Sequence, residues 1–129
     1  FLDRGAGSCV LRQPAFGEIV QNALQHFDGE RYRLLAWCVM PNHLHVLFET
    51  FSGHPLGSVV HSWKTFTART INKALGRSGK LWQDDYFDTY IRDDAHLGAE
   101  ITYIEHNPVK AGLAAKATDW PWSSAARRK

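Results

Sequence analysis

Two histidines, His43 and His45, are separated by a single leucine and follow a short turn after an apolar run. In a β-strand, residues two apart point to the same face, with their Cα atoms roughly 6.5–7 Å apart. Two imidazoles placed in this way can bind one divalent metal ion, but a third ligand must then come from elsewhere in the fold. The alternative is that each histidine is only a polar residue on a solvated strand face.

Two further polar residues, Tyr103 and Asn107, lie four positions apart in a segment whose apolar residues have helical spacing. Residues four apart share one side of a helix, so these two side chains are expected to project together. Asp93 or Asp94 can cap the start of this helix, and Pro108 predicts that it ends at Asn107. The other tyrosines lie in strand-like segments, where packing in the core or at an edge is expected.

Lysine and arginine side chains recur along one predicted helix, at residues 56–75, and in the loop that follows it. The usual meaning of such a row is a solvated helix face. The alternative is an edge that binds the phosphate groups of a nucleic acid backbone. The residues that would make these contacts are Lys64, Arg69, Lys73, Arg77 and Lys80.

The elements that position these groups are predicted from the spacing of apolar residues and from turn signals. Pro41 and Asn42 favour a tight turn between two strands, and Gly76 is a typical helix stop. Trp120 and Trp122 are expected to close the core instead of stacking on bases. Helices are predicted at 14–27, 56–75 and up to 107, and strands at 32–40, 43–49 and 81–91.

Size and composition favour one compact domain over residues 1–129, with 44% hydrophobic content and five tryptophans. The formal charge of +2 permits a polyanionic partner without requiring one. The two cysteines, Cys9 and Cys38, form neither a disulfide framework nor a zinc pattern, so a cytoplasmic protein is expected. No apolar run approaches the ~20 residues that span a bilayer, and no membrane partner is expected.

The order of these elements predicts an α+β sandwich. The sequence begins with Phe1 and not with methionine, so we expect that a first strand of the sheet can be missing from this chain. Packing of the last helix on the sheet would bring Tyr103 close to His43 and His45.

Four stretches of the sequence form a pattern that is more specific than the histidine pair alone. They are residues 40–45 (MPNHLH), 82–87 (WQDDYF), 103–113 (YIEHNPVKAGL) and 119–124 (DWPWSS). In this order they resemble the IS200-like transposases, and most closely the REP-associated tyrosine transposases. The resemblance covers most of the chain from about residue 31 onward.

This resemblance implies a ferredoxin-like sandwich of the HUH type (His, hydrophobic, His), with an antiparallel sheet and helices packed on one face. It implies that Tyr103 is a nucleophile that cuts and rejoins single-stranded or hairpin DNA through a 5′-phosphotyrosine intermediate. His43, His45 and Asn107 would bind Mg²⁺ or Mn²⁺, and relatives act as monomers or homodimers. A phenol with a pKa near 10 needs such activation to attack a phosphodiester.

Two other functions remain open from the sequence. A domesticated protein could keep the fold and bind DNA or RNA hairpins without catalysis. A metal-dependent hydrolase could use His43 and His45 with water as the nucleophile, and its cleavage would then survive the loss of the Tyr103 hydroxyl.

Overall fold

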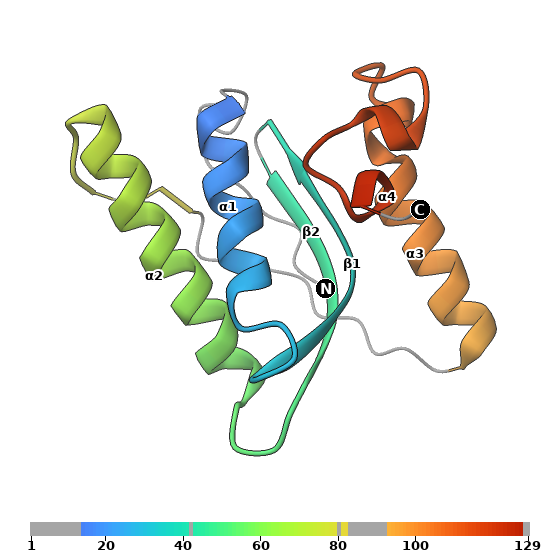
Figure 1. Ribbon diagram of the computed structural model, residues 1–129, viewed down its shortest axis with the longest axis horizontal. Coiled ribbons are helices and arrows are strands. Elements are labelled where there is room, and N and C mark those ends of the chain that lie inside the picture. The colour runs from blue at the N-terminus through green and yellow to red at the C-terminus, as the bar shows by residue number, and fades with distance from the viewer. Residues whose placement is uncertain (1–13, 42, 80, 83–92, 128–129) are drawn as a thin grey trace.

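The computed structural model of the protein describes residues 14–41, 43–79, 81–82 and 93–127, which form an α+β fold (Figure 1). An antiparallel hairpin of strands β1 (Tyr32–Met40) and β2 (His43–Thr50) stands at its centre. The described helices are α1 (Pro14–His26), α2 (Leu56–Leu75), α3 (Asp94–Lys110), the short 3₁₀ helix η2 (Ala117–Asp119) and α4 (Ser124–Arg127). The bounds of α1, β1, β2 and α2 agree with the predicted elements to within one residue, whereas α3 ends later than predicted and neither η2 nor α4 was predicted.

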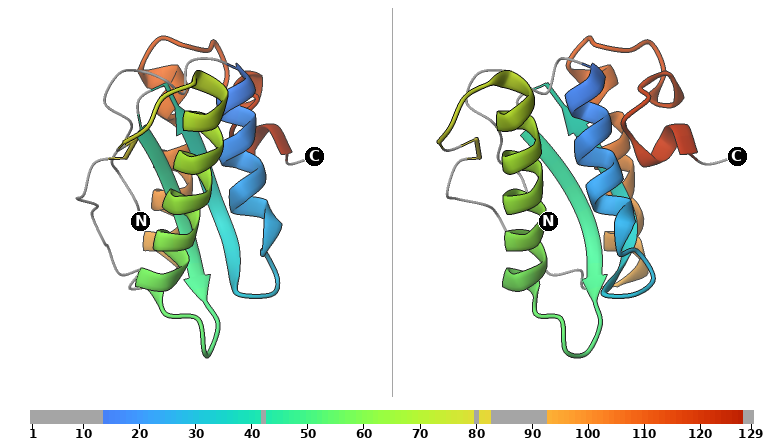
Figure 2. Two further views of the ribbon diagram at one scale, coloured as in Figure 1. Left: turned by 90° about the vertical axis from the view of Figure 1, so that its left-hand side faces the viewer. Right: turned by 60° about the vertical axis from the view of Figure 1, so that its left-hand side comes forward.

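Alternate residues of each strand point to opposite sides of the hairpin. Both faces of the hairpin are apolar, because the strands carry apolar residues at both sets of positions. Val39 pairs with Leu44, and both side chains are buried on the side of α1 and α2. The neighbouring pair, Cys38 and His45, points to the side of α3, where Cys38 joins a second buried cluster. Figure 2 shows the hairpin between the two groups of helices.

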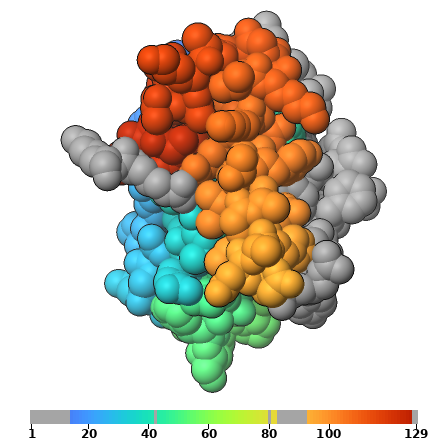
Figure 3. Space-filling view, turned by 90° about the vertical axis from the view of Figure 1, so that its right-hand side faces the viewer, coloured from blue at the N-terminus to red at the C-terminus, as the bar shows by residue number. Residues whose placement is uncertain are grey.

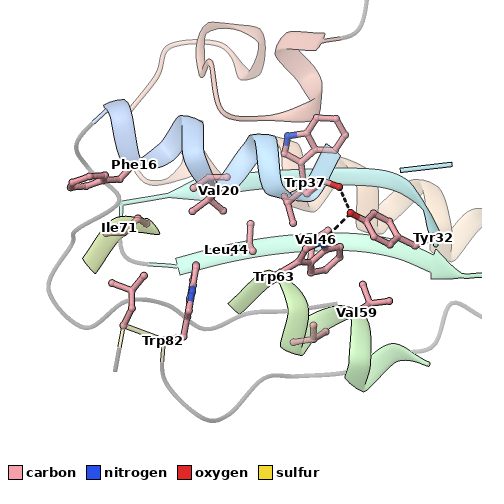
Figure 4. Close-up of a cluster of buried hydrophobic side chains, with 14 residues drawn as sticks. Phe16, Val20, Tyr32, Trp37, Leu44, Val46, Val59, Trp63, Ile71 and Trp82 are labelled. Atoms are coloured by element: carbon pink, nitrogen blue, oxygen red, sulfur yellow. Dashed lines mark hydrogen bonds between the residues drawn. The ribbon is translucent and has the colours of Figure 1, made fainter. Parts of the chain in front are cut away.

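The larger core lies between the hairpin, α1 and α2, and its aromatic polar atoms are hydrogen-bonded (Figure 4). Trp63 Nε1 donates to the Tyr32 hydroxyl at 3.0 Å, and Trp82 Nε1 donates to the Thr67 hydroxyl at 2.8 Å. These bonds matter because a buried polar group without a partner costs about 1–3 kcal/mol. The burial of Tyr32 confirms that this tyrosine serves the core.

A smaller core lies on the other face of the hairpin, under α3. Its buried residues are Ala36, Cys38, Met40, Leu47 and Ile104. The α+β class with an antiparallel sheet is confirmed. The helices are not confined to one face of the sheet as expected, because α1 and α2 pack on one face and α3 covers the opposite one (Figure 1). The physical reason is that both faces of β1 are apolar, so each has to be covered by a helix.

Helix α3 begins as predicted but ends later. The Asp93 side chain caps its start by accepting a hydrogen bond from the His96 amide at 2.8 Å. The predicted end at Asn107 is wrong, because the helix continues through Pro108 to Lys110. Proline removes one helical hydrogen bond and crowds the preceding turn. Here Pro108 is fully buried and α3 packs along β1, so tertiary packing outweighs that local cost.

Some predictions fall outside the described residues. Leu81 and Trp82 are buried in the larger core, but the rest of the predicted strand at 81–91 cannot be compared. Asn42 and Lys80 also lie outside the described residues. The single domain over 1–129 stays a prediction. None of the described helices is both long and apolar enough to cross a membrane.

Candidate active site

The histidine pair on β2 faces helix α3. The rings of His43 and His45 lie edge to face, with centroids 4.7 Å apart and an interplanar angle of 85°. His45 is 2% exposed, and both of its ring nitrogens are shielded from solvent, whereas His43 is half-buried. The expectation that the two side chains share one strand face is therefore confirmed. Leu44, between them, is buried on the opposite side of the hairpin.

The tyrosine on α3 reaches this pair within one chain. The centroid of the Tyr103 ring lies 6.0 Å from that of His45, with the two rings at 85°. Tyr103 is 46% exposed, so part of its side chain remains open to solvent. Packing of α3 on the hairpin thus brings together residues that lie far apart in the sequence, as expected.

Asn107 lies one helical turn after Tyr103, as its spacing predicted. Its side-chain Nδ2 donates to the Tyr103 backbone oxygen at 2.9 Å. The amide oxygen of Asn107 is the atom of this side chain that can act as a metal ligand, because the nitrogen is only a donor. The Asn107 side chain is half-buried.

The donor set fits a divalent metal ion only if an amide takes part. Among the described residues, no three histidine, cysteine, aspartate or glutamate side chains gather so that they could hold a metal. Two imidazoles with the Asn107 oxygen would give a mixed nitrogen and oxygen site, which suits several divalent transition ions. Mg²⁺ prefers oxygen ligands and keeps several of its waters.

Cys38 pairs with His45 across the hairpin but is a poor metal ligand. Burial raises the pKa of the Cys38 thiol, and together with a smaller contribution from the nearby Glu105 carboxylate it brings the value to about 12. Metals bind the thiolate, which is almost absent at neutral pH when the pKa is this high. The thiol therefore contributes packing on this face of the sheet.

Lys110 is a residue of this region that the sequence reasoning missed. Its ammonium nitrogen lies 6.0 Å from the centroid of the Tyr103 ring, over the ring face. The seven-residue separation is two helical turns, which places both side chains on one side of α3. The seven-residue spacing could have indicated that Lys110 lies beside Tyr103. It was not considered, because the helix was predicted to end at Asn107.

The predicted phosphate-binding row is not brought to the tyrosine. Lys64, Arg69 and Lys73 lie on α2, and Arg77 follows it, whereas α2 and α3 are on opposite sides of the hairpin (Figure 1). Arg69, Lys73 and Arg77 are exposed, and Arg77 Nε donates to the Asn72 side chain at 3.1 Å. An open groove between α1 and α2 also lies on this distant side.

The family model described as IS200-like transposase matches residues 11–107, which include the histidines, Tyr103 and Asn107. The chain belongs to the IS200-like transposase family. The predicted likeness to REP-associated members is confirmed by two relatives and a solved structure.

The first relative is a Haemophilus influenzae protein provisionally named a REP-associated tyrosine transposase. It is 29% identical over 119 residues, and the match covers 84% of this chain and 66% of the relative. The second is the REP-associated tyrosine transposase of Escherichia coli K12, 28% identical over 108 residues, with coverage of 83% and 63%. The chain thus spans somewhat less than two thirds of the length of these relatives.

A solved structure has the same fold. It is a REP-associated tyrosine transposase bound to a REP hairpin, and it superposes with a TM-score of 0.76 at 23% identity. The match covers 98% of this chain and 74% of that one. The antiparallel hairpin with helices on both sides is therefore the architecture of a known transposase.

Proposed function

We propose that this chain is the catalytic part of a REP-associated tyrosine transposase, which nicks and rejoins single-stranded DNA at hairpin-type repeats. The observation that supports the proposal most is the contact between Tyr103 and His45 in one chain, with His43 beside them. We therefore propose that one subunit supplies all of the reacting groups and that a monomer can act.

In the proposed reaction, the hydroxyl oxygen of Tyr103 attacks the phosphorus of the scissile phosphodiester. The bond between phosphorus and the 3′-oxygen breaks, and the leaving oxygen takes up a proton while the phenol gives up its own. The product is a 5′-phosphotyrosine link and a free 3′-hydroxyl. Attack by a 3′-hydroxyl on this link reverses the chemistry and joins the strands without an external energy source.

The remaining residues would neutralise and orient the phosphate. His43, His45 and Asn107 would hold Mg²⁺ or Mn²⁺, which when bound supplies positive charge to a phosphoryl oxygen. Lys110 would add a second positive charge next to Tyr103, since its ammonium group lies over the same ring. The shielded position of His45 limits the competition of water for this part of the site.

The proposed DNA partner is a single strand next to a hairpin. The solved structure that shares the fold holds a REP hairpin, and the open side of Tyr103 gives an exposed backbone access to the phenol. The basic row of α2 would contact DNA away from the cut, because it lies on the other side of the hairpin. Its proposed members remain Lys64, Arg69, Lys73, Arg77 and Lys80.

The test uses a stem-loop oligonucleotide with a single-stranded flank, labelled at its 3′ end, because the tyrosine would keep the downstream fragment. Incubation with Mn²⁺ or Mg²⁺ should give a labelled protein band that survives denaturing electrophoresis. Tyr103→Phe should abolish this band and still bind the hairpin. Tyr32→Phe is the matched control, since it removes the same atom from a buried core tyrosine, and it should keep the band when assayed at a temperature at which it stays folded.

Each of the other outcomes points to a different function. Hairpin binding by the wild type without any adduct would indicate a non-catalytic binder. Cleavage that persists in Tyr103→Phe and leaves no protein-linked end would indicate a hydrolase that uses water. Either result would reject the tyrosine mechanism.

A further inference from the structure

The segment that follows α3 returns to the hairpin and lies along the edge of β1 that faces away from β2. We call residues Trp120 to Ser124 the C-terminal clamp. The Val39 amide donates to the Trp122 carbonyl at 2.8 Å, and Trp120 Nε1 donates to the Val39 carbonyl at 2.9 Å. Cys38 and Ser123 form an isolated antiparallel bridge at the same place. The clamp thus satisfies backbone groups of β1 on the edge away from β2.

The two tryptophans of the clamp pack against both cores. Trp122 joins the larger core and Trp120 joins the smaller one, with their ring centroids 5.3 Å apart. On α1, Gly17 leaves room for the indole of Trp122, because a Cβ atom there would lie 3.2 Å from the ring. These contacts confirm that the two tryptophans close the core, and they fix the position of the clamp relative to the sheet.

One serine hydroxyl then connects the clamp and the sheet to the tyrosine helix. Ser124 Oγ accepts a hydrogen bond from the Trp37 amide at 3.0 Å and donates to the Glu105 carboxylate. Ser124 is 3% exposed and Glu105 is 8% exposed, so the bond is buried. Hydrogen bonds to a buried carboxylate are strong, since the charge would otherwise be poorly solvated.

Glu105 lies two residues after Tyr103 on α3. At about 100° per residue the two side chains are on nearly opposite sides of the helix, and only about 3 Å apart along its axis. A rotation of α3 by about 20° would separate Glu105 from Ser124 and displace groups at the helix surface by about 2 Å. Displacements of about 1 Å can slow an enzymatic step about 100-fold.

We infer that Glu105 and Ser124 are positioning residues, which hold α3 at the rotation that keeps Tyr103 beside His45 of the same chain. This inference rests on the proposed function for its catalytic consequence. The contacts of the clamp with β1 and α3 do not depend on that function. In Figure 3 the tyrosine helix and the C-terminal segment lie against each other over this face of the molecule.

The decisive comparison is between Glu105→Leu and Glu105→Gln. Leucine has a similar volume but no acceptor, and the Ser124 hydroxyl can then turn to the Trp37 carbonyl, which lies 3.3 Å away. Glutamine keeps an acceptor oxygen for Ser124. Because the Ser124 hydroxyl keeps an acceptor in Glu105→Leu, no buried donor is left unsatisfied, and the hydrogen exchange of α1 and α2 shows whether the variant is folded.

Three quantities should be measured on the full chain. They are the amide hydrogen exchange of the α3 peptide around Tyr103, the single-turnover rate of adduct formation with the stem-loop DNA, and the dissociation constant for that DNA. For Glu105→Leu we expect faster exchange confined to α3, an adduct rate lower by about tenfold or more, and hairpin affinity within about twofold. Glu105→Gln should resemble the wild type in all three.

Wild-type exchange in α3 together with a wild-type adduct rate in Glu105→Leu would overturn the inference. Faster exchange spread equally over α1, α2 and α3 would overturn it too, because it would show general destabilisation. If Glu105→Leu fails to fold, the same three quantities are measured on Ser124→Ala, and the same results are expected. If the wild type itself forms no adduct, the proposed function fails, and the exchange data still decide whether the clamp holds α3.

Discussion

The hydroxyl of Tyr32 joins three elements of the larger core, so its removal should be costly. It donates to the backbone carbonyl of Leu24 in the last turn of α1, and it accepts from Trp63 Nε1 of α2 at 3.0 Å. Tyr32 itself lies on β1 and is 1% exposed, so water cannot replace either partner. Tyr32→Phe removes both hydrogen bonds and adds no bulk.

The expected loss follows from these contacts. Two hydrogen bonds contribute about 1 kcal/mol each, and a buried group left without a partner costs about 1–3 kcal/mol. We therefore expect the free energy of unfolding to fall by about 2–4 kcal/mol, which corresponds to a decrease in Tm of roughly 10 °C for a chain of this size. Such a loss is a large part of the 5–15 kcal/mol or so that stabilises a typical domain.

Urea unfolding followed by tryptophan fluorescence measures this loss, and a thermal scan measures the shift in Tm. Tyr103→Phe is the matched control, because it removes the same oxygen from a side chain that is 46% exposed. It should change stability by less than about 0.5 kcal/mol. A Tyr32→Phe protein as stable as the wild type would refute the reasoning that this hydroxyl joins α1, β1 and α2.

Three further predictions concern the clamp, the thiol and the lysine of the site. Gly17→Ala should lower stability by about 1 kcal/mol in urea unfolding, because its Cβ crowds Trp122, whereas Gly98→Ala, which meets nothing within 4 Å, should raise it by about 0.5–1 kcal/mol. The pKa of the Cys38 thiol is about 12 in the folded protein and 9.0 for an ordinary thiol, so this group should leave stability unaffected below pH 9 and lower it as the pH rises from there. Mass spectrometry should accordingly find Cys38 almost unmodified by iodoacetamide at pH 8 until urea is added. Lys110→Gln should slow adduct formation by about tenfold without lowering Tm, and an unchanged rate would remove Lys110 from the site.

The sequence by itself determined the features that depend on local periodicity. His43 and His45 share a strand face because side chains alternate with a period of two, and Tyr103 and Asn107 share a helix side because of the helical repeat. The stop of α2 at Gly76 was equally predictable, since that residue adopts a left-handed conformation with φ of 66°. Such features are set by residues a few positions apart.

Only the tertiary structure decided which face α3 covers and what lies beside Tyr103. The smaller core that draws α3 onto the histidine side exists because β1 is apolar on both faces, and the buried Pro108 keeps the helix intact past its expected end. The bond between Ser124 and Glu105, like the separation of the basic row from the tyrosine, has no local signal in the sequence. These outcomes depend on the packing free energy of surfaces from distant parts of the chain, which local spacing does not encode.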